Sequence, residues 1–167
     1  LFLNSPNNPS GQICENLEAI ADIAKKYNLI ILSDEIYSEL SFKDNYKSIS
    51  NFCPEKAIVS TGLSKWCGAG GWRLGYFLVP NSLIEIKNMI NVLASETFSA
   101  VSAPIQYAAI KAYKSDYSHY INKSRNILSA VGSYVYENLK SNKVLINEPQ
   151  GGFYLMPEFL NKKFNSS

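Results

Sequence analysis

Histidine and cysteine are scarce in this chain. Its 167 residues include one histidine, His119, and three cysteines, Cys14, Cys53 and Cys67. No two cysteines form a Cys-x-x-Cys pair, and one histidine cannot complete a metal site with them at any familiar spacing. An odd number of thiols is typical of free cysteines in a reducing compartment, so we expect a cytoplasmic protein without a metal centre.

Long apolar runs and clusters of like charge are also lacking. The run at 29–32 is four residues long, whereas a membrane-spanning helix needs about 20. The formal net charge is only +2, and no basic run has the length of a nucleic-acid-binding arm. We therefore expect neither a membrane nor a nucleic acid as partner. The hydrophobic content of 46% is nevertheless sufficient for a buried core.

The spacing of apolar residues predicts alternating helices and strands. Helical spacing favours helices over 15–27, 82–94, 100–113 and 116–139, with Ser82 and Glu85 as a capping box. Asn28 is expected in the left-handed conformation that ends a helix. Short apolar runs predict strands over 1–3, 29–32, 57–59, 74–79, 144–146 and 153–156.

This order of elements predicts an α/β fold. We assign residues 1–95 to part of a doubly wound sheet in a large domain, 96–141 to a helical connector, and 142–167 to the start of a smaller α+β domain. The chain opens on a strand-like run without a preceding methionine. We therefore expect a fragment with residues missing on both sides.

Three polar clusters follow the predicted strands, at the sheet edge where open α/β sheets bind ligands. They are 8–11 (Asn-Pro-Ser-Gly), 33–37 (Ser-Asp-Glu-Ile-Tyr) and 60–75, a glycine-rich loop that contains Lys65. Each has an ordinary structural alternative. The first could be a simple turn, Asp34 could cap a helix, and Lys65 could be a solvated surface lysine. A Walker-type phosphate loop does not fit, because Lys65 follows Leu63-Ser64 rather than the required glycine.

Taken together, the clusters closely resemble the class I/II aminotransferases, a family of fold-type I enzymes that depend on pyridoxal 5'-phosphate (PLP). The resemblance rests on Asp-Glu-x-Tyr at 34–37, on Ser-Lys at 64–65 followed by Gly-Trp-Arg-x-Gly at 71–75, and on Asn-Pro-Ser-Gly at 8–11. The segment 149–154 (Pro-Gln-Gly-Gly-Phe-Tyr) is also similar to the family's entry into its small domain. The resemblance therefore covers essentially the whole chain, and it implies that residues 1–95 are the C-terminal part of the PLP-binding large domain.

The resemblance implies a role for each site residue. Lys65 would hold PLP as a Schiff base and then act as the base that moves the substrate's α-proton. Asp34 would keep the ring nitrogen of PLP protonated. Asn8 and Tyr37 would hydrogen-bond the 3-oxygen of the ring, and Arg73 would grip the phosphate with its planar guanidinium.

Two features depart from the family pattern. Many relatives carry a phosphate-binding serine three residues before the lysine, and Gly62 occupies that position here. Either Ser64 or Ser60 replaces it, or the phosphate depends on residues outside this sequence. In addition, the chain contains only two arginines, Arg73 and Arg125, so none is evident for the substrate carboxylate if Arg125 is structural.

The resemblance implies transfer of an amino group between an amino acid and a 2-oxo acid, in a homodimer whose subunits could meet near 95–102. Alternatives within the fold are a PLP-dependent lyase, decarboxylase or synthase, and an alternative outside catalysis is an aminotransferase-like regulatory domain. We expect the 167-residue chain to be inactive by itself. The motifs do not select a substrate.

Overall fold

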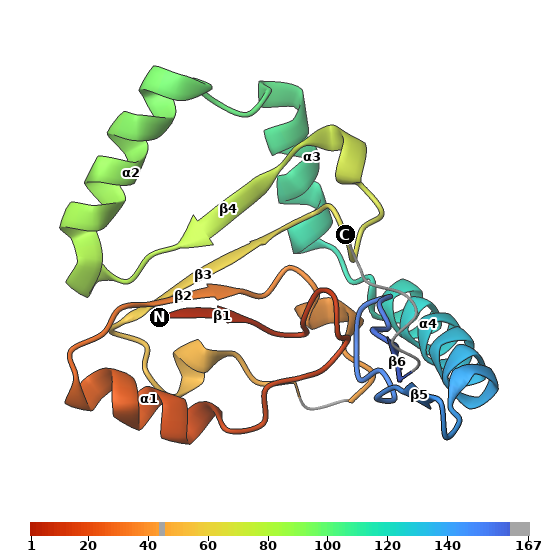
Figure 1. Ribbon diagram of the computed structural model, residues 1–167. Helices are drawn as coiled ribbons and strands as arrows, with labels where there is room; N and C mark the ends of the chain where they lie inside the picture. Colours follow the sequence, from red (N-terminus) through yellow and green to blue (C-terminus); the bar gives the residue numbers. More distant parts are fainter. Residues whose placement is uncertain (44–45, 161–167) are drawn as a thin grey trace.

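The computed structural model describes residues 1–43 and 46–160 and contains a four-stranded sheet with the order β1-β2-β3-β4 (Figure 1). The first three strands are parallel and the fourth is antiparallel to the third. The strands are β1 (Phe2–Asn4), β2 (Ile31–Asp34), β3 (Ala57–Gly62) and β4 (Gly75–Leu78). The predicted α/β class is confirmed.

Helix α1 (Leu17–Lys26) connects β1 to β2 and covers one face of the sheet (Figure 1). Its buried residues Leu17, Ala21 and Ala24 are spaced by four and three positions and pack with Ile31 in the first core cluster. Burial of a leucine or isoleucine side chain contributes roughly 1.5–3 kcal/mol. The helix predicted over 15–27 is thus confirmed, as is the left-handed Asn28 that follows it, with φ of 53°.

Strand β2 differs from its prediction. It begins at Ile31 rather than at residue 29. A continuous apolar run such as 29–32 predicts a strand buried on both faces, yet Leu32 is 36% exposed. Ile31 and Ser33 are fully buried, because they lie on the face that α1 covers. Among the described residues, no helix covers Leu32 to the same degree.

Three helices follow the sheet: α2 (Ile84–Thr97), α3 (Ala103–Lys114) and α4 (Ser118–Leu139). In Figure 1, α2 and α3 lie on the side of β4 away from α1, and α4 lies beside the C-terminal strands. The predicted capping box is wrong. Leu83 is the N-cap of α2, after a 3₁₀ turn at Asn81–Leu83, and the Ser82 hydroxyl donates instead to the Glu55 carbonyl.

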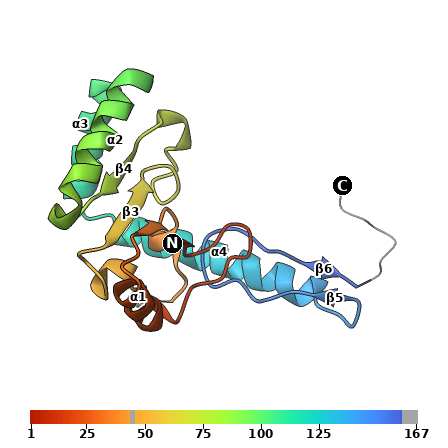
Figure 2. The ribbon, with the colours of Figure 1, turned by 60° about the vertical axis from the view of Figure 1, so that its left-hand side comes forward.

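The last strands are β5 (Val144–Leu145) and β6 (Glu158–Phe159), which form an antiparallel pair alongside α4 (Figure 2). The strand predicted over 153–156 is wrong. Gly152 has a positive φ of 70° and donates its N–H to the carbonyl of Leu40, so the segment docks as a loop rather than as a ladder strand. Part of the predicted small-domain segment, 161–167, lies outside the described residues.

Two further absences hold for the described residues. None of their helices combines the length and the apolarity that a membrane crossing requires. Within the same ranges, no three histidine, cysteine, aspartate or glutamate side chains gather as a metal site would require.

Candidate active site

Asp34 is the last residue of β2 and lies between the ends of β1 and β3, paired in register with Asn4 and Ser60. Its Oδ1 accepts a hydrogen bond from the N–H of Ile36 at 3.2 Å and a long one from the Ser60 hydroxyl at 3.5 Å. The side chain therefore caps a local turn rather than the helix that the structural alternative proposed, since the 3₁₀ turn at Ser38–Leu40 has Tyr37 as its N-cap. No lysine or arginine forms an ion pair with it in the described ranges 1–43 and 46–160, so its charge is available to a cationic ligand.

Tyr37 lies three residues after Asp34 and is only 4% exposed. Its hydroxyl is 2.9 Å from the hydroxyl of Tyr154, far along the chain. Burial is the largest cause that raises the pKa of Tyr37, the contact with Tyr154 adds to it, and the charge of Asp34 acts in the same direction. The Asn8 amide acts in the opposite direction and lowers this pKa. Asn8, Asp34 and Tyr154 thus all lie close enough to influence one phenol.

Lys65 stands at the start of the loop that follows β3. Its Nζ lies 5.6 Å from the centre of the Tyr37 ring and 5.6 Å from that of Phe153, within cation–π range of both. Trp66 beside it is buried in the second core cluster, and the Lys65 carbonyl accepts the N–H of Gly68 at 3.2 Å. The backbone on both sides is therefore anchored, and the amine is directed toward Tyr37.

Arg73 and Ser64 belong to the same loop as Lys65, but their side chains make fewer contacts with the other predicted site residues. Arg73 is exposed, has a left-handed φ of 57°, and donates from Nη1 to the Gly70 carbonyl at 2.7 Å. Ser64 is half-buried. Within the described part of the chain, no hydrogen bond or ion pair joins either side chain to Asn8, Asp34, Tyr37 or Lys65. The structure therefore brings four of the six predicted site residues together.

The four gathered residues fit the chemical groups of PLP. A carboxylate without a cationic partner suits a protonated ring nitrogen, and a phenol and an amide suit a ring oxygen. A lysine amine that faces two adjacent aromatic rings suits a carbonyl carbon that it can attack. An exposed guanidinium near the end of the loop suits a phosphate.

Gly62 explains one departure from the family pattern. It ends β3 opposite Gly75 of β4, and a Cβ at Gly62 would lie 2.5 Å from the Leu74 carbonyl oxygen and 2.8 Å from the Gly75 Cα. Both atoms belong to backbone and cannot rotate away. In this backbone, a serine at position 62 would require the two strands to separate.

We expect Gly62→Ala to destabilise the protein by about 1–3 kcal/mol, the usual cost of overpacking. The measurement is the free energy of unfolding in urea. Gly71→Ala is the matched control, because a Cβ at Gly71 meets nothing within 4 Å and its φ is not positive. Equal stability of the two variants would mean that β3 and β4 move apart without cost.

The segment 148–154 was not predicted as part of the site, yet it closes one side of it. Gly11 accepts backbone N–H groups from Gln150 at 2.8 Å and Gly151 at 3.1 Å, and the Gln150 side chain accepts the N–H of Ile13 at 2.8 Å. This clamp brings Phe153 and Tyr154 to Lys65 and Tyr37. The Pro-Gln-Gly-Gly-Phe-Tyr motif was the available signal, but nothing in the sequence placed it beside Asp-Glu-x-Tyr.

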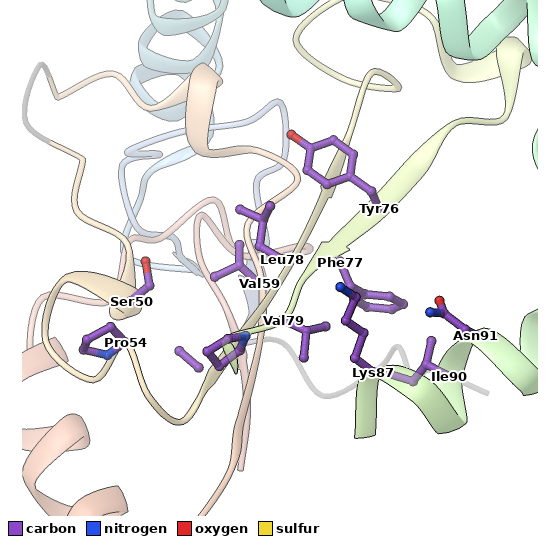
Figure 3. Close-up of a pocket in the computed structure, with 12 residues that line it drawn as sticks. Ser50, Pro54, Val59, Tyr76, Phe77, Leu78, Val79, Lys87, Ile90 and Asn91 are labelled. Atoms are coloured by element: carbon purple, nitrogen blue, oxygen red, sulfur yellow. The ribbon is translucent and has the colours of Figure 1, made fainter. Parts of the chain in front are cut away.

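The largest hollow among the described residues lies elsewhere. It encloses about 600 Å³ between β3, β4 and α2, and Phe77, Lys87 and Asn91 converge on it (Figure 3). It shares no residue with the candidate site. Its lining is mainly apolar and holds no carboxylate, so we do not connect it with the chemistry at Lys65.

The α/β sheet, with a lysine, a carboxylate, a phenol and an amide near its carboxyl edge, has the architecture of part of a fold-type I enzyme. Comparison with known proteins specifies the family: residues 1–165 match the model "Aminotransferase class I and II", and the chain belongs to this family.

Individual relatives agree. An aspartate aminotransferase of Thermotoga maritima is 35% identical over 161 residues, which are 93% of this chain and 40% of the relative. An aromatic-amino-acid aminotransferase of Thermococcus litoralis is 32% identical, and the match covers 99% of this chain and 43% of the relative. The solved alanine aminotransferase of Pyrococcus furiosus superposes with a TM-score of 0.87 at 32% identity, over 98% of this chain and 43% of that one.

The chain therefore spans about 40% of the length of the relatives it matches. All three relatives are named as aminotransferases, and nothing in these matches favours a lyase, a decarboxylase, a synthase or a regulatory domain.

Proposed function

We propose that this chain supplies the lysine-bearing part of a PLP-dependent aminotransferase that moves an amino group between an amino acid and a 2-oxo acid. The observation that carries the proposal is the Lys65 amine, which faces the adjacent rings of Tyr37 and Phe153. Tyr37 also lies within reach of the charge of Asp34, whose carboxylate forms no ion pair with the described residues. The family membership and the names of the relatives support it.

The resemblance to the family suggests the proposed roles, and the positions of Asn8, Asp34, Tyr37 and Lys65 support four of them. When bound, PLP supplies an electron-accepting ring that stabilises negative charge at the substrate's α-carbon. Asp34 holds a proton at the ring nitrogen, and Asn8 and Tyr37 orient the ring through its 3-oxygen. Lys65 would hold the cofactor through its Nζ, and the same amine would serve as the base for the proton at the substrate's α-carbon. Arg73 binds the phosphate. Ser64 or Ser60 takes the role of the phosphate-binding serine that many relatives carry at the position of Gly62.

Phosphate binding by Arg73 requires its side chain to leave the Gly70 carbonyl, which it contacts in this structure. That carbonyl is a weak competitor, because a charge-assisted bidentate contact with phosphate is stronger than one hydrogen bond to a neutral acceptor. The left-handed backbone at Arg73 directs its side chain back toward the loop rather than along β4.

The particular amino acid substrate is not part of the proposal. The relatives are named for aspartate, aromatic amino acids and alanine, which differ in charge and size.

We propose a homodimer, supported by the exposed apolar side chains of Met89, Val92 and Leu93 on α2 and of Phe98 at the 95–102 segment. A cytoplasmic location is supported by the three free cysteines.

The domain division is likewise a proposal: 1–95 in the PLP-binding large domain, 96–141 as a helical connector and 142–167 as the start of the small domain. The clamp between Gly11 and the segment 150–151 ties the last part to the first, so we propose that the functional boundary follows residue 154 rather than residue 141.

A panel of amino acids tests the proposed function. The natural gene product, loaded with PLP, is expected to convert the bound cofactor to its amine form with at least one amino acid, a change followed by absorbance. No conversion with any member of the panel would contradict the proposal.

A polypeptide restricted to residues 1–167 is expected to show no turnover above that of free PLP. Its only arginines are Arg73, assigned to the phosphate, and Arg125, whose Nε donates to the Glu39 carbonyl at 2.7 Å and whose Nη2 lies 3.5 Å from the Glu39 carboxylate. No arginine therefore remains for a substrate carboxylate. The same assay measures this, and clear turnover would show that Arg125 or a lysine takes that role.

A further inference from the structure

The contact between Tyr37 and Tyr154 has no place in the roles given above. The two hydroxyls are 2.9 Å apart, and the two rings meet edge to face with centres 5.5 Å apart. Phe153 packs against both rings, at 5.4 Å from Tyr37 and 4.8 Å from Tyr154. The packing of three aromatic rings therefore fixes the distance between the two phenols. The contact between their hydroxyls is stabilised by this packing.

Tyr154 is held in place because residues 150–151 are hydrogen-bonded to Gly11 and Phe42. Gln150 and Gly151 are tied to Gly11, while Phe42 donates its N–H to the Gln150 carbonyl at 2.9 Å. A Cβ at Gly151 would come within 3.0 Å of the Pro6 side chain, which indicates a close fit of this backbone against the first loop. Tyr154 thus has little freedom to move away from Tyr37.

The direction of the hydrogen bond matters, because a phenol has one proton and two lone pairs. Either hydroxyl can be the donor across the 2.9 Å that separates them. In this structure the contact with Tyr154 raises the pKa of Tyr37, which is the effect of Tyr37 donating to Tyr154. If a ligand oxygen replaces Tyr154 as the acceptor of that proton, the hydroxyl pair can persist only with Tyr154 as its donor. The proton of Tyr37 is then directed to a ligand oxygen.

We propose that Tyr154 is a positioning residue, whose hydroxyl donates to Tyr37 and thereby commits the Tyr37 proton to the 3-oxygen of the cofactor. This inference rests on the proposed function. It assigns to the segment 148–154 a part in tuning the site, in addition to closing it.

The inference predicts a change in the titration of the nitrogen that joins Lys65 to PLP. Negative charge on the neighbouring 3-oxygen favours a proton on this nitrogen, and a hydrogen bond from Tyr37 withdraws that charge. Loss of the Tyr154 hydroxyl weakens donation by Tyr37, so Tyr154→Phe should raise the pKa of the nitrogen. The expected rise is about half a pH unit, the effect of one neutral hydrogen bond.

The experiment is a spectrophotometric pH titration of the natural gene product loaded with PLP. Tyr37→Phe should raise the pKa further than Tyr154→Phe, and the double variant should match Tyr37→Phe because Tyr154 acts through Tyr37. Replacement of Tyr154 with 3-fluorotyrosine, a more acidic phenol, should lower the pKa instead. Tyr76→Phe is the matched control: it lies in another edge-to-face tyrosine pair, 5.6 Å from Tyr113, beside the same core cluster.

Three outcomes would overturn the inference: no shift in Tyr154→Phe, a shift equal to that of Tyr76→Phe, or full additivity with Tyr37→Phe. Thermal unfolding without cofactor should be the same for Tyr154→Phe and the control, which separates tuning from packing. Failure of the proposed function has a different signature. The natural protein would then show no absorbance from PLP attached to a lysine, or Tyr37→Phe itself would leave the pKa unchanged.

Discussion

Lys65→Ala is expected to abolish covalent attachment of PLP and to lower turnover by about 10³-fold or more, the contribution of a positioned proton-transfer group together with a lost covalent link. In the natural protein, borohydride reduction followed by peptide mapping should place the phosphopyridoxyl group on Lys65. The reason is local: among the described residues, Lys65 is the lysine whose amine lies over the ring of Tyr37, near Asp34.

Lys47 offers a matched control for this variant. Its Nζ lies 5.9 Å from the centre of the Phe52 ring, a cation–aromatic contact of the same kind outside the site. Lys47→Ala should therefore retain the label on Lys65 and nearly full turnover. A label on any lysine other than Lys65, or an active Lys65→Ala variant, would remove the basis of the proposed function.

The site residues in the motifs that resemble the family could be identified from the sequence, because these motifs are short and continuous. Each of the three polar clusters follows a strand, and parallel strands bring their carboxyl ends to one edge, so the meeting of Asp34 with the loop that holds Asn8 followed from topology alone. The left-handed Asn28 was predictable for a similar reason, since only neighbouring residues decide it. Local chemistry and strand order together account for most of the site.

The missed features all depend on contacts between distant parts of the chain. The segment 153–156 is apolar enough for a strand, but hydrogen bonds from Gln150, Gly151 and Gly152 to residues more than 100 positions away hold it as a loop. Ser82 and Glu85 have capping-box spacing, yet the Ser82 hydroxyl donates its hydrogen bond to the Glu55 carbonyl instead. Periodicity carries no information about such competing partners, and this is why the pairing of Tyr37 with Tyr154 was not predicted.

The position of Gly62 shows how a departure from a family pattern becomes interpretable only in three dimensions. From the sequence, the absence of a serine there indicated only that another residue replaces it in the phosphate site. In the structure, the same glycine allows β3 and β4 to approach within the space that a Cβ would fill. The residue thus has a backbone role that no motif comparison expresses.

The second large effect is expected at Asp34. Asp34→Asn should lower turnover by about 10³-fold or more, because a carboxamide carries no charge to keep the ring nitrogen of PLP protonated. The fold should survive, since the asparagine oxygen can still accept the Ile36 N–H that Asp34 accepts at 3.2 Å. The measurements are the rate of the half-reaction with the preferred amino acid and the thermal unfolding of the cofactor-free protein.

Asp22→Asn is the control, because Asp22 is exposed on α1, which lies on the first core cluster rather than at the site. It removes the same charge from the protein and should leave the rate unchanged. If Asp34→Asn stays within about threefold of the natural protein, a change of less than 1 kcal/mol in the barrier, then the carboxylate only caps the turn at Ile36. The absence of a cationic partner argues against this outcome. A cap needs only one acceptor oxygen, whereas the second oxygen of Asp34 has no hydrogen-bond partner among the residues described.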